Sequence, residues 1–170
     1  MAIRTHLDEL IEYPDNVISA LAASPIVVGL ILDKPQPAMD GTDDETARLQ
    51  MFDFDYVPET NLEAKAYICV DADMVASPTG TIKDMELYVQ IIINKSYMEL
   101  SDKTWKGRKG NRRDNLAREI DLLLNGSRDY GIGRLDLVSC RTANVPAAFS
   151  SKLLTYRIPD FARDRGVGIQ

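Results

Sequence analysis

Two alternating segments on either side of a turn sequence constrain the fold of this chain most strongly. Apolar residues alternate with polar or aromatic ones in residues 64–74 and 82–97, namely Ala66, Ile68, Val70 and Met74 in the first and Leu87, Val89, Ile91 and Ile93 in the second. A period of two is typical of strands, and Ser77-Pro78-Thr79-Gly80 is typical of a turn. We therefore predict a long antiparallel hairpin. Tyr88 and Ile92 lie on the other face of the second strand, which indicates that both faces are partly covered.

The first 33 residues show helical periodicity. Thr5 is a candidate N-cap for a first helix, and Pro14 is expected to end that helix because the residue before a proline avoids the α-helical region. A second short helix then carries Val17, Ile18 and Leu21 on one face.

Residues 26–32 form the longest apolar run. Their β-branched side chains suit a buried strand, but Ser24-Pro25 is typical of an N-cap followed by proline at the first helical position, which favours a helix. A membrane-spanning helix needs about 20 apolar residues. This run is far shorter, so we expect no membrane span, and the charged N-terminus lacks the features of a cleavable signal.

Residues 40–63 carry eight acidic side chains and a single basic one, Arg48. The acids are irregularly spaced, and prolines and a glycine precede most of them. We therefore predict a solvated acidic loop excursion over residues 34–60, in which residues 51–54 alone are strand-like. Five of these acids are candidates for an acidic interface: Asp43, Asp44, Glu45, Asp53 and Asp55.

The second half of the chain contains one clear amphipathic helix and two strands. The apolar stripe of the helix ends at Asn125-Gly126, a typical C-terminal stop, and is made of Leu116, Ile120, Leu123 and Leu124. Residues 135–140 and 152–158 are strand-like. Helices, grouped strands, one helix and closing strands, in that order, are typical of an α+β fold with a mostly antiparallel sheet.

The chain has 170 residues, a formal net charge of −6 and 45% hydrophobic residues, which is ordinary for a globular protein. We expect a single domain over residues 1–170. Its parts are the N-terminal helices (1–33), the acidic excursion (34–60), a core of sheet and helix (61–161) and a tail without structure of its own (162–170).

Histidine and cysteine usage limits the chemistry that the chain can perform. His6 is the only histidine, so a Ser-His-Asp or Cys-His catalytic set would have to use it, and a His-rich metal site cannot form. Cys69 and Cys140 lie in strand-like patterns and are expected to be buried free thiols rather than a disulfide. We expect no enzymatic activity and no cofactor.

Two weak motifs point to other functions. Asp53, Glu63 and Lys65 are the residue types that a Mg²⁺-dependent nuclease uses, which makes such an enzyme an alternative. Asp71 and Asp73 share one strand face and could hold a cation, although exposed carboxylates are the commoner explanation. Gly131-Ile132-Gly133 follows a predicted helix and precedes a predicted strand, the reverse of the order that a dinucleotide-binding turn requires. This order favours a tight turn over a cofactor site.

Residues 103–113 form the sharpest electrostatic feature, with six positive charges and no acid. Three interpretations stand: a contact between subunits of opposite charge, a solvated loop, or a nucleic-acid-binding module that neutralises phosphates. The candidate residues for a subunit-interface or DNA-facing role are Lys103, Trp105, Lys106, Arg108, Lys109, Arg112 and Arg113.

The chain also resembles small neck and tail-completion proteins of tailed bacteriophages. The resemblance covers residues 57–161, and it rests on residues 115–126, 128–135 and 153–161, together with 60–68 and the strand from Ile82. These motifs are structural rather than catalytic. The acidic excursion is a departure from that pattern.

The resemblance implies a virion structural protein: a tail terminator or head–tail joining subunit of the phage neck. Such α+β protomers form a ring, commonly a hexamer, that caps the tail tube and meets the head–tail connector. They have no active site, and they are made in the host cytoplasm. Partners implied in this way are further copies of the chain, tail-tube and connector proteins, and DNA in the channel.

Overall fold

The computed structural model describes residues 7–56, 65–76, 82–130 and 133–161. Helices and strands lie in the order α1 (Asp8–Ala22), α2 (Pro25–Leu32), α3 (Asp43–Arg48), β1 (Met51–Phe52), β2 (Ala66–Ala76), β3 (Ile82–Asn94), the 3₁₀ turn η1 (Lys95–Tyr97), α4 (Arg112–Leu124), β4 (Asp136–Arg141) and β5 (Phe149–Phe161). The strands form one sheet in the order β1-β2-β3-β5-β4. The α+β class with N-terminal helices and a mostly antiparallel sheet is therefore confirmed; among the described strands only β1 pairs in parallel, with β2.

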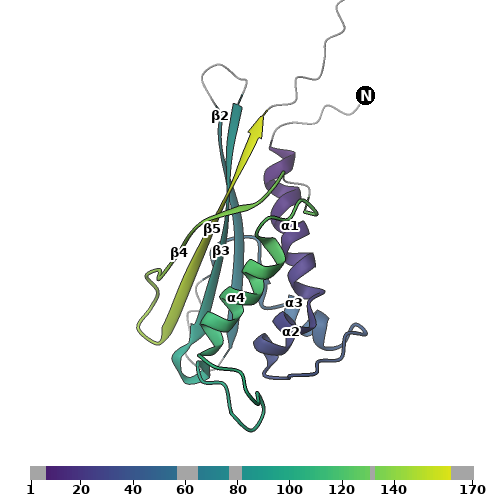
Figure 1. Ribbon diagram of the computed structural model, residues 1–170, viewed down its shortest axis with the longest axis vertical. Coiled ribbons are helices and arrows are strands. Elements are labelled where there is room, and N and C mark those ends of the chain that lie inside the picture. Colours follow the sequence, from purple (N-terminus) through teal and green to yellow (C-terminus); the bar gives the residue numbers. More distant parts are fainter. Residues whose placement is uncertain (1–6, 57–64, 77–81, 131–132, 162–170) are drawn as a thin grey trace, which may run out of the picture.

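The predicted hairpin is confirmed as the centre of the sheet. β2 and β3 pair antiparallel with Ile68 opposite Ile91 and Val70 opposite Val89, and all four side chains are fully buried. β5 pairs along the other side of β3 over its whole length. The alternation in the sequence thus corresponds to one face that packs against α1, α2 and α4, which lie together on one side of the sheet (Figure 1).

The opposite face of the sheet carries a smaller apolar cluster. Tyr67, Cys69, Ile92 and Phe149 are buried there, and Phe52 and Tyr56 pack against them. The expectation that both faces of the second strand are covered is borne out, because Ile92 is 1% exposed. The segment after β1 covers this face, which no helix reaches among the described residues.

The prediction that Pro14 ends the first helix is wrong, since α1 continues through Pro14 to Ala22. Tyr13, Pro14 and Val17 are buried in the contact between α1 and the sheet, so packing of this face outweighs the hydrogen bond that a proline removes. The N-cap prediction at Thr5 lies outside the described residues, as does the tail after residue 161.

Helix α2 is confirmed with the predicted cap. The Ser24 hydroxyl accepts a hydrogen bond from the Val27 N–H at 3.4 Å, and Pro25 stands at the first helical position. Val27, Val28, Leu30 and Ile31 are buried in the core. Within the described residues no single helix is long and apolar enough to cross a membrane; α1 and α2 pass that test only as a pair bent by 79°.

The acidic excursion is more ordered than predicted, because Asp43–Arg48 forms helix α3 instead of a loop. Three acids occupy its first turn, where the positive end of the helix dipole stabilises negative charge. Ala47 is fully buried in the core against the larger helices. The short strand-like segment is confirmed as β1, although it contains only Met51 and Phe52.

Helix α4 ends at Leu124 as predicted, and Gly126 adopts the left-handed φ of 78° that follows such a stop. Leu116, Ile120 and Leu124 are fully buried. The hydroxyl of Tyr156 on β5 donates to Asp121 at 3.1 Å and ties this helix to the sheet. The two closing strands are confirmed as β4 and a longer β5.

The two cysteines differ in exposure, which corrects the expectation that both are buried. Cys69 is 2% exposed, and burial raises the pKa of its thiol, whereas Cys140 on the edge strand is exposed. A thiol reagent should therefore label one cysteine rapidly in the folded protein and both after unfolding in urea. The Cys140→Ser variant should lose the rapid phase; rapid labelling of that variant would contradict the placement of Cys69.

Candidate functional site

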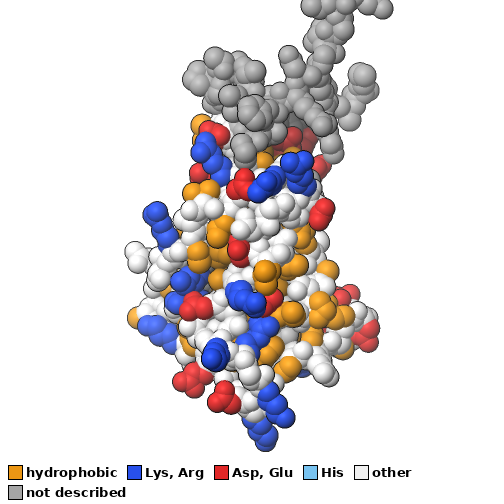
Figure 2. All heavy atoms as spheres, in the orientation of Figure 1, with side chains coloured by type: hydrophobic (Ala, Val, Ile, Leu, Met, Phe, Trp, Pro, Cys, Tyr) orange, Lys and Arg blue, Asp and Glu red, His pale blue; other side chains and the backbone are white. Residues whose placement is uncertain are grey.

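The basic segment divides into buried and exposed groups. Most of the segment lies in the loop between η1 and α4, and its last two arginines, Arg112 and Arg113, are the first two residues of α4. Arg112 and Trp105 are 1% and 7% exposed, whereas Lys103, Lys106 and Lys109 are exposed. Figure 2 shows Lys and Arg side chains at the lowest point of the molecule, where Figure 1 draws this loop. Only part of the predicted positive charge is therefore available to a partner.

Arg112 is the centre of a buried polar network. Its guanidinium donates to the carbonyl oxygens of Leu30 (2.6 Å) and Tyr97 (2.8 Å) and to Asp33 Oδ1 (2.7 Å), with a longer contact to the Glu99 carbonyl. It also lies 3.9 Å from the centroid of the Tyr97 ring. A buried charge requires this degree of pairing. Arg112 therefore joins α2, η1 and α4 and does not face solvent.

Trp105 is held in the same network. Its indole N–H donates to Asp33 Oδ1 at 2.8 Å, and its ring packs against α2 beside Gly29. Burial raises the pKa of Asp33, but the hydrogen bonds from Arg112 and Trp105 outweigh it and leave this pKa below its ordinary value. The stacking or wedging role that the sequence allowed for Trp105 would require an exposed ring face, which this packing does not leave.

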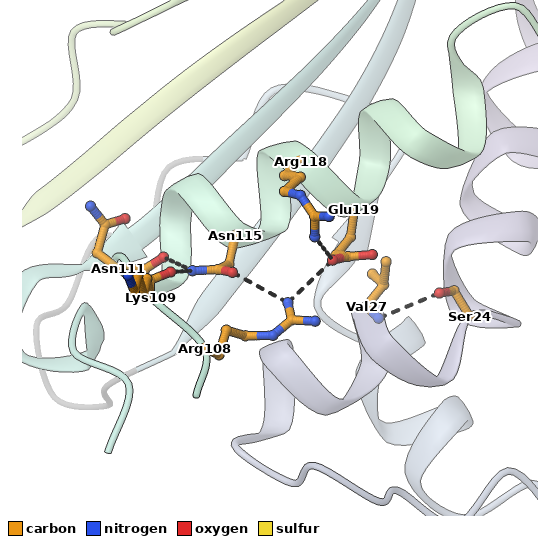
Figure 3. A network of polar contacts seen from close by, with 8 residues as sticks. All are labelled: Ser24, Val27, Arg108, Lys109, Asn111, Asn115, Arg118 and Glu119. Carbon is orange, nitrogen blue, oxygen red and sulfur yellow. Dashed lines mark hydrogen bonds and ion pairs between the residues drawn. The ribbon is translucent and has the colours of Figure 1, made fainter. Parts of the chain in front are cut away.

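Arg108 and Arg118 share the carboxylate of Glu119, in the middle of α4 (Figure 3). Both guanidinium groups donate to Glu119, at 3.3 and 2.8 Å, and Arg108 also reaches the Asn115 side chain. The amide of Asn115 donates to the carbonyl oxygens of Lys109 and Asn111. The end of the basic loop is thus fixed to the helix, and much of the Arg108 charge is neutralised within the chain.

Arg113 is also largely used inside the chain. Its guanidinium donates to the Ser150 hydroxyl at 2.7 Å and to Asp114 at 3.0 Å, and only 16% of the side chain is exposed. It links the first turn of α4 to β5.

Two open clefts adjoin the exposed lysines. One, of about 430 Å³, is lined by Lys106, Gly107, Arg108, Lys109, Asn115 and Arg118. The other, of about 370 Å³, lies between the loop and α2 and is lined by Ile26, Pro35, Lys103, Thr104, Trp105, Lys106 and Arg108. The first has a polar, cationic lining, whereas the second combines apolar walls with cations.

The acidic candidates are likewise divided. Asp43 accepts hydrogen bonds from Lys34 and from the Ala38 N–H, and the first of these most strongly lowers its pKa. Asp44 accepts from the Gly41 N–H at 2.9 Å. The exposed members of the set are Glu45, Asp53 and Asp55. The structure therefore separates acids that organise α3 from acids that face solvent.

The residues proposed for metal chemistry are not assembled into a site in the described part of the chain. Glu63 lies outside the described residues, and Asp53 is exposed on the segment after β1. No group of three or more His, Cys, Asp or Glu side chains there is placed to hold a metal ion. Among those residues, Asp53 and Lys65 alone do not make a nuclease centre.

Asp71 and Asp73 are exposed on the sheet face away from the helices, near Tyr88 and Glu86 of the paired strand. The hydroxyl of Tyr88 donates to Glu86, and this hydrogen bond is the main reason that the Tyr88 pKa is raised. The arrangement is a polar patch on a strand pair, as expected for exposed carboxylates.

Comparison with known proteins identifies the family. The family model for YomW matches residues 7–158, which span α1 to most of β5. The chain belongs to the YomW family. No curated protein matches it.

A solved structure shares the fold of this YomW-family chain. It is a protein from the virion of a native gene transfer agent particle, with a TM-score of 0.51 and 15% sequence identity. The match covers 92% of this chain and 98% of the other. The two proteins therefore share a fold over nearly their whole lengths.

Sequence reasoning missed the structural role of Asp33. It follows α2 with a left-handed φ of 58°, which presents its carboxylate to Arg112 and Trp105. A signal exists in the sequence, because aspartate tolerates this conformation at a helix end better than most residues. Its two partners, however, lie more than 70 residues away, so the network could not be read from local spacing.

Proposed function

We propose that this chain is a structural protein of a phage-like virion and not an enzyme. The observation that carries the proposal is the shared fold with a gene transfer agent virion protein, which extends over 92% of one chain and 98% of the other. Near-complete coverage of both chains means that the likeness concerns the whole protomer and not one common motif. The resemblance of residues 57–161 to phage neck proteins, read from the sequence, points the same way.

Within the virion, we propose a tail terminator or head–tail joining role at the neck. In that role copies of the chain form a closed ring, with six as the expected number, and the ring caps the tail tube and meets the head–tail connector. Segregated charge supports this proposal, because exposed lysines and exposed acids on one protomer suit head-to-tail contacts between identical chains.

The mass of the purified protein in solution tests the ring. We expect a single assembled species near six times the 19.0 kDa chain mass, and ring-shaped particles in electron micrographs. Light scattering over a range of concentrations gives the mass directly. A protein that stays monomeric at every concentration, and that binds neither tail tubes nor connector, would overturn the proposal.

A further inference from the structure

We propose that an acidic aromatic knob on one copy of the chain docks into the lysine-rimmed cleft of a second copy. The knob is Asp53, Phe54 and Asp55, and the cleft is the one between α2 and the basic loop, with Lys103 and Lys106 at its rim. This inference rests on the proposed ring and names the contact that would hold neighbouring subunits together.

The knob presents an aromatic ring to solvent from a firmly held segment. Phe54 is 53% exposed and lies between two exposed aspartates. Its ring meets Phe52 edge-on at 5.5 Å, and Phe52 stacks on Tyr56 at 4.2 Å. The backbone of Tyr56 is tied to the buried thiol of Cys69 in both directions. An exposed phenyl group held in this way loses little conformational freedom on binding.

The cleft offers the complementary surface. Ile26 and Pro35 are the exposed apolar residues of its lining, whereas Trp105 is 7% exposed and contributes little surface, and Ile26 is 44% exposed in the first turn of α2. Lys103 and Lys106 are exposed and make no ion pair among the described residues. An apolar floor beneath two cations matches a phenyl ring between two carboxylates.

The two surfaces lie on opposite faces of the sheet. The knob lies between Phe52 and Tyr56, which pack on the cluster of Tyr67 and Cys69 away from the helices, whereas the cleft is built against α2 on the helical side. The knob of one copy therefore cannot dock into the cleft of the same copy. A contact between different surfaces of identical chains is heterologous, and its repetition generates a ring when the rotation closes.

A second copy fits the cleft better than DNA does. DNA-stacking sites expose aromatic faces, but Trp105 is 7% exposed and its indole N–H is bound to Asp33. Arg108, the arginine in the lining of the cleft, is already paired with Glu119. The acidic side chains that complement the two lysines are present on the chain itself, in the knob.

The test uses two variants of the full chain that each disable one side. The knob variant is Asp53→Asn, Phe54→Ser and Asp55→Asn, and the cleft variant is Lys103→Glu and Lys106→Glu. All five side chains are exposed, so folding should be retained and is checked by thermal unfolding. The matched control reverses two exposed arginines elsewhere, Arg128→Glu and Arg141→Glu, with the same change in net charge as the cleft variant.

Each variant alone should need on the order of tenfold or more higher concentration to assemble than the parent chain, because central contacts dominate such interfaces. The control should assemble like the parent. An equimolar mixture of the two variants should form a one-to-one heterodimer, since only the intact knob of one meets the intact cleft of the other. Mass measured by light scattering or native mass spectrometry distinguishes these species.

Three outcomes would overturn the contact. If the parent forms rings and both variants do too, the contact is wrong while the proposed function stands. If the parent never assembles, the contact is wrong and so is the proposed ring, and binding to tail tubes or connector then decides whether the virion role stands. If the cleft variant assembles normally but loses salt-dependent affinity for duplex DNA, the lysines form a nucleic-acid surface instead.

Discussion

Replacement of Arg112 by methionine should lower the free energy of unfolding by about 3–5 kcal/mol, the usual effect of removing one partner from a buried charge pair. Methionine retains much of the apolar stem but none of the donors. The carbonyl oxygens of Leu30 and Tyr97 would lose their guanidinium partner, and Asp33 would lose its ion pair. Since domains of this kind are stable by only about 5–15 kcal/mol, urea unfolding should show a large shift in midpoint.

Arg118→Met is the matched control for that prediction. Arg118 is an arginine of the same helix with 66% of its side chain exposed, and Glu119 keeps Arg108 as a second partner. Its replacement should cost about 1 kcal/mol or less. Equal losses for the two variants would show that the Arg112 network does not stabilise the fold.

The loss of stability caused by Arg112→Met should also depend on pH, and it should be smaller in acid. The pKa of Asp33 is lower in the folded chain than the ordinary aspartate value of 3.8, because burial is outweighed by the hydrogen bonds that Arg112 and Trp105 donate to its carboxylate, so the pair contributes stability above that pH. This contribution is lost as the pH falls below 3.8 and through the folded-state pKa. The difference in free energy of unfolding between the parent and Arg112→Met should therefore become smaller in acid. A larger difference in acid would contradict the pairing of Arg112 with Asp33.

Replacement of Gly29 by alanine should destabilise the protein by about 1–3 kcal/mol, as overpacking does. A Cβ added at Gly29 would lie 2.4 Å from the carbonyl oxygen of Lys34, a backbone atom that cannot move aside without moving the chain. The helix end is closed there by the Lys34 N–H, which donates to the Gly29 carbonyl at 2.9 Å. The chain turns back so closely at Asp33 that only glycine fits.

Helix propensity alone predicts the opposite sign for Gly29→Ala, because alanine favours a helix interior by about 1 kcal/mol over glycine. Asn16→Ala, at an exposed position of α1, serves as the control and should stabilise the protein slightly. Urea denaturation of both variants separates the two effects. A Gly29→Ala variant that is more stable than the parent would contradict the close approach of the Lys34 carbonyl oxygen to this position.

The elements that the sequence predicted correctly are those with a local, repeated signal. The hairpin has its alternation over both strands, and α4 has an apolar stripe with a glycine stop, so each could be identified without knowledge of its neighbours. Among the predicted helices and loops, those that failed were the helix break at Pro14 and the loop over residues 43–48. In both places burial against other elements outweighed the local preference.

The candidate site shows the same division. Its location, a basic segment ahead of α4 and an acidic segment around β1, is evident from composition. Composition does not reveal which of the basic and acidic side chains are exposed, because the residues that bury the others come from elsewhere in the chain. The spacing of Trp105 and Arg112 does not reveal that both bind Asp33, and nothing in the acidic run distinguishes Asp43 from Asp53.

The hairpin, the helices α2 and α4 and the separation of opposite charges along the chain could be read from local sequence, since each depends on residues close together in the chain. Which charged side chains remain in water depends instead on the packing of distant elements. Desolvation of an arginine or aspartate depends on what packs over it, and at Arg112 those groups come from α2 and η1 as well as from its own helix.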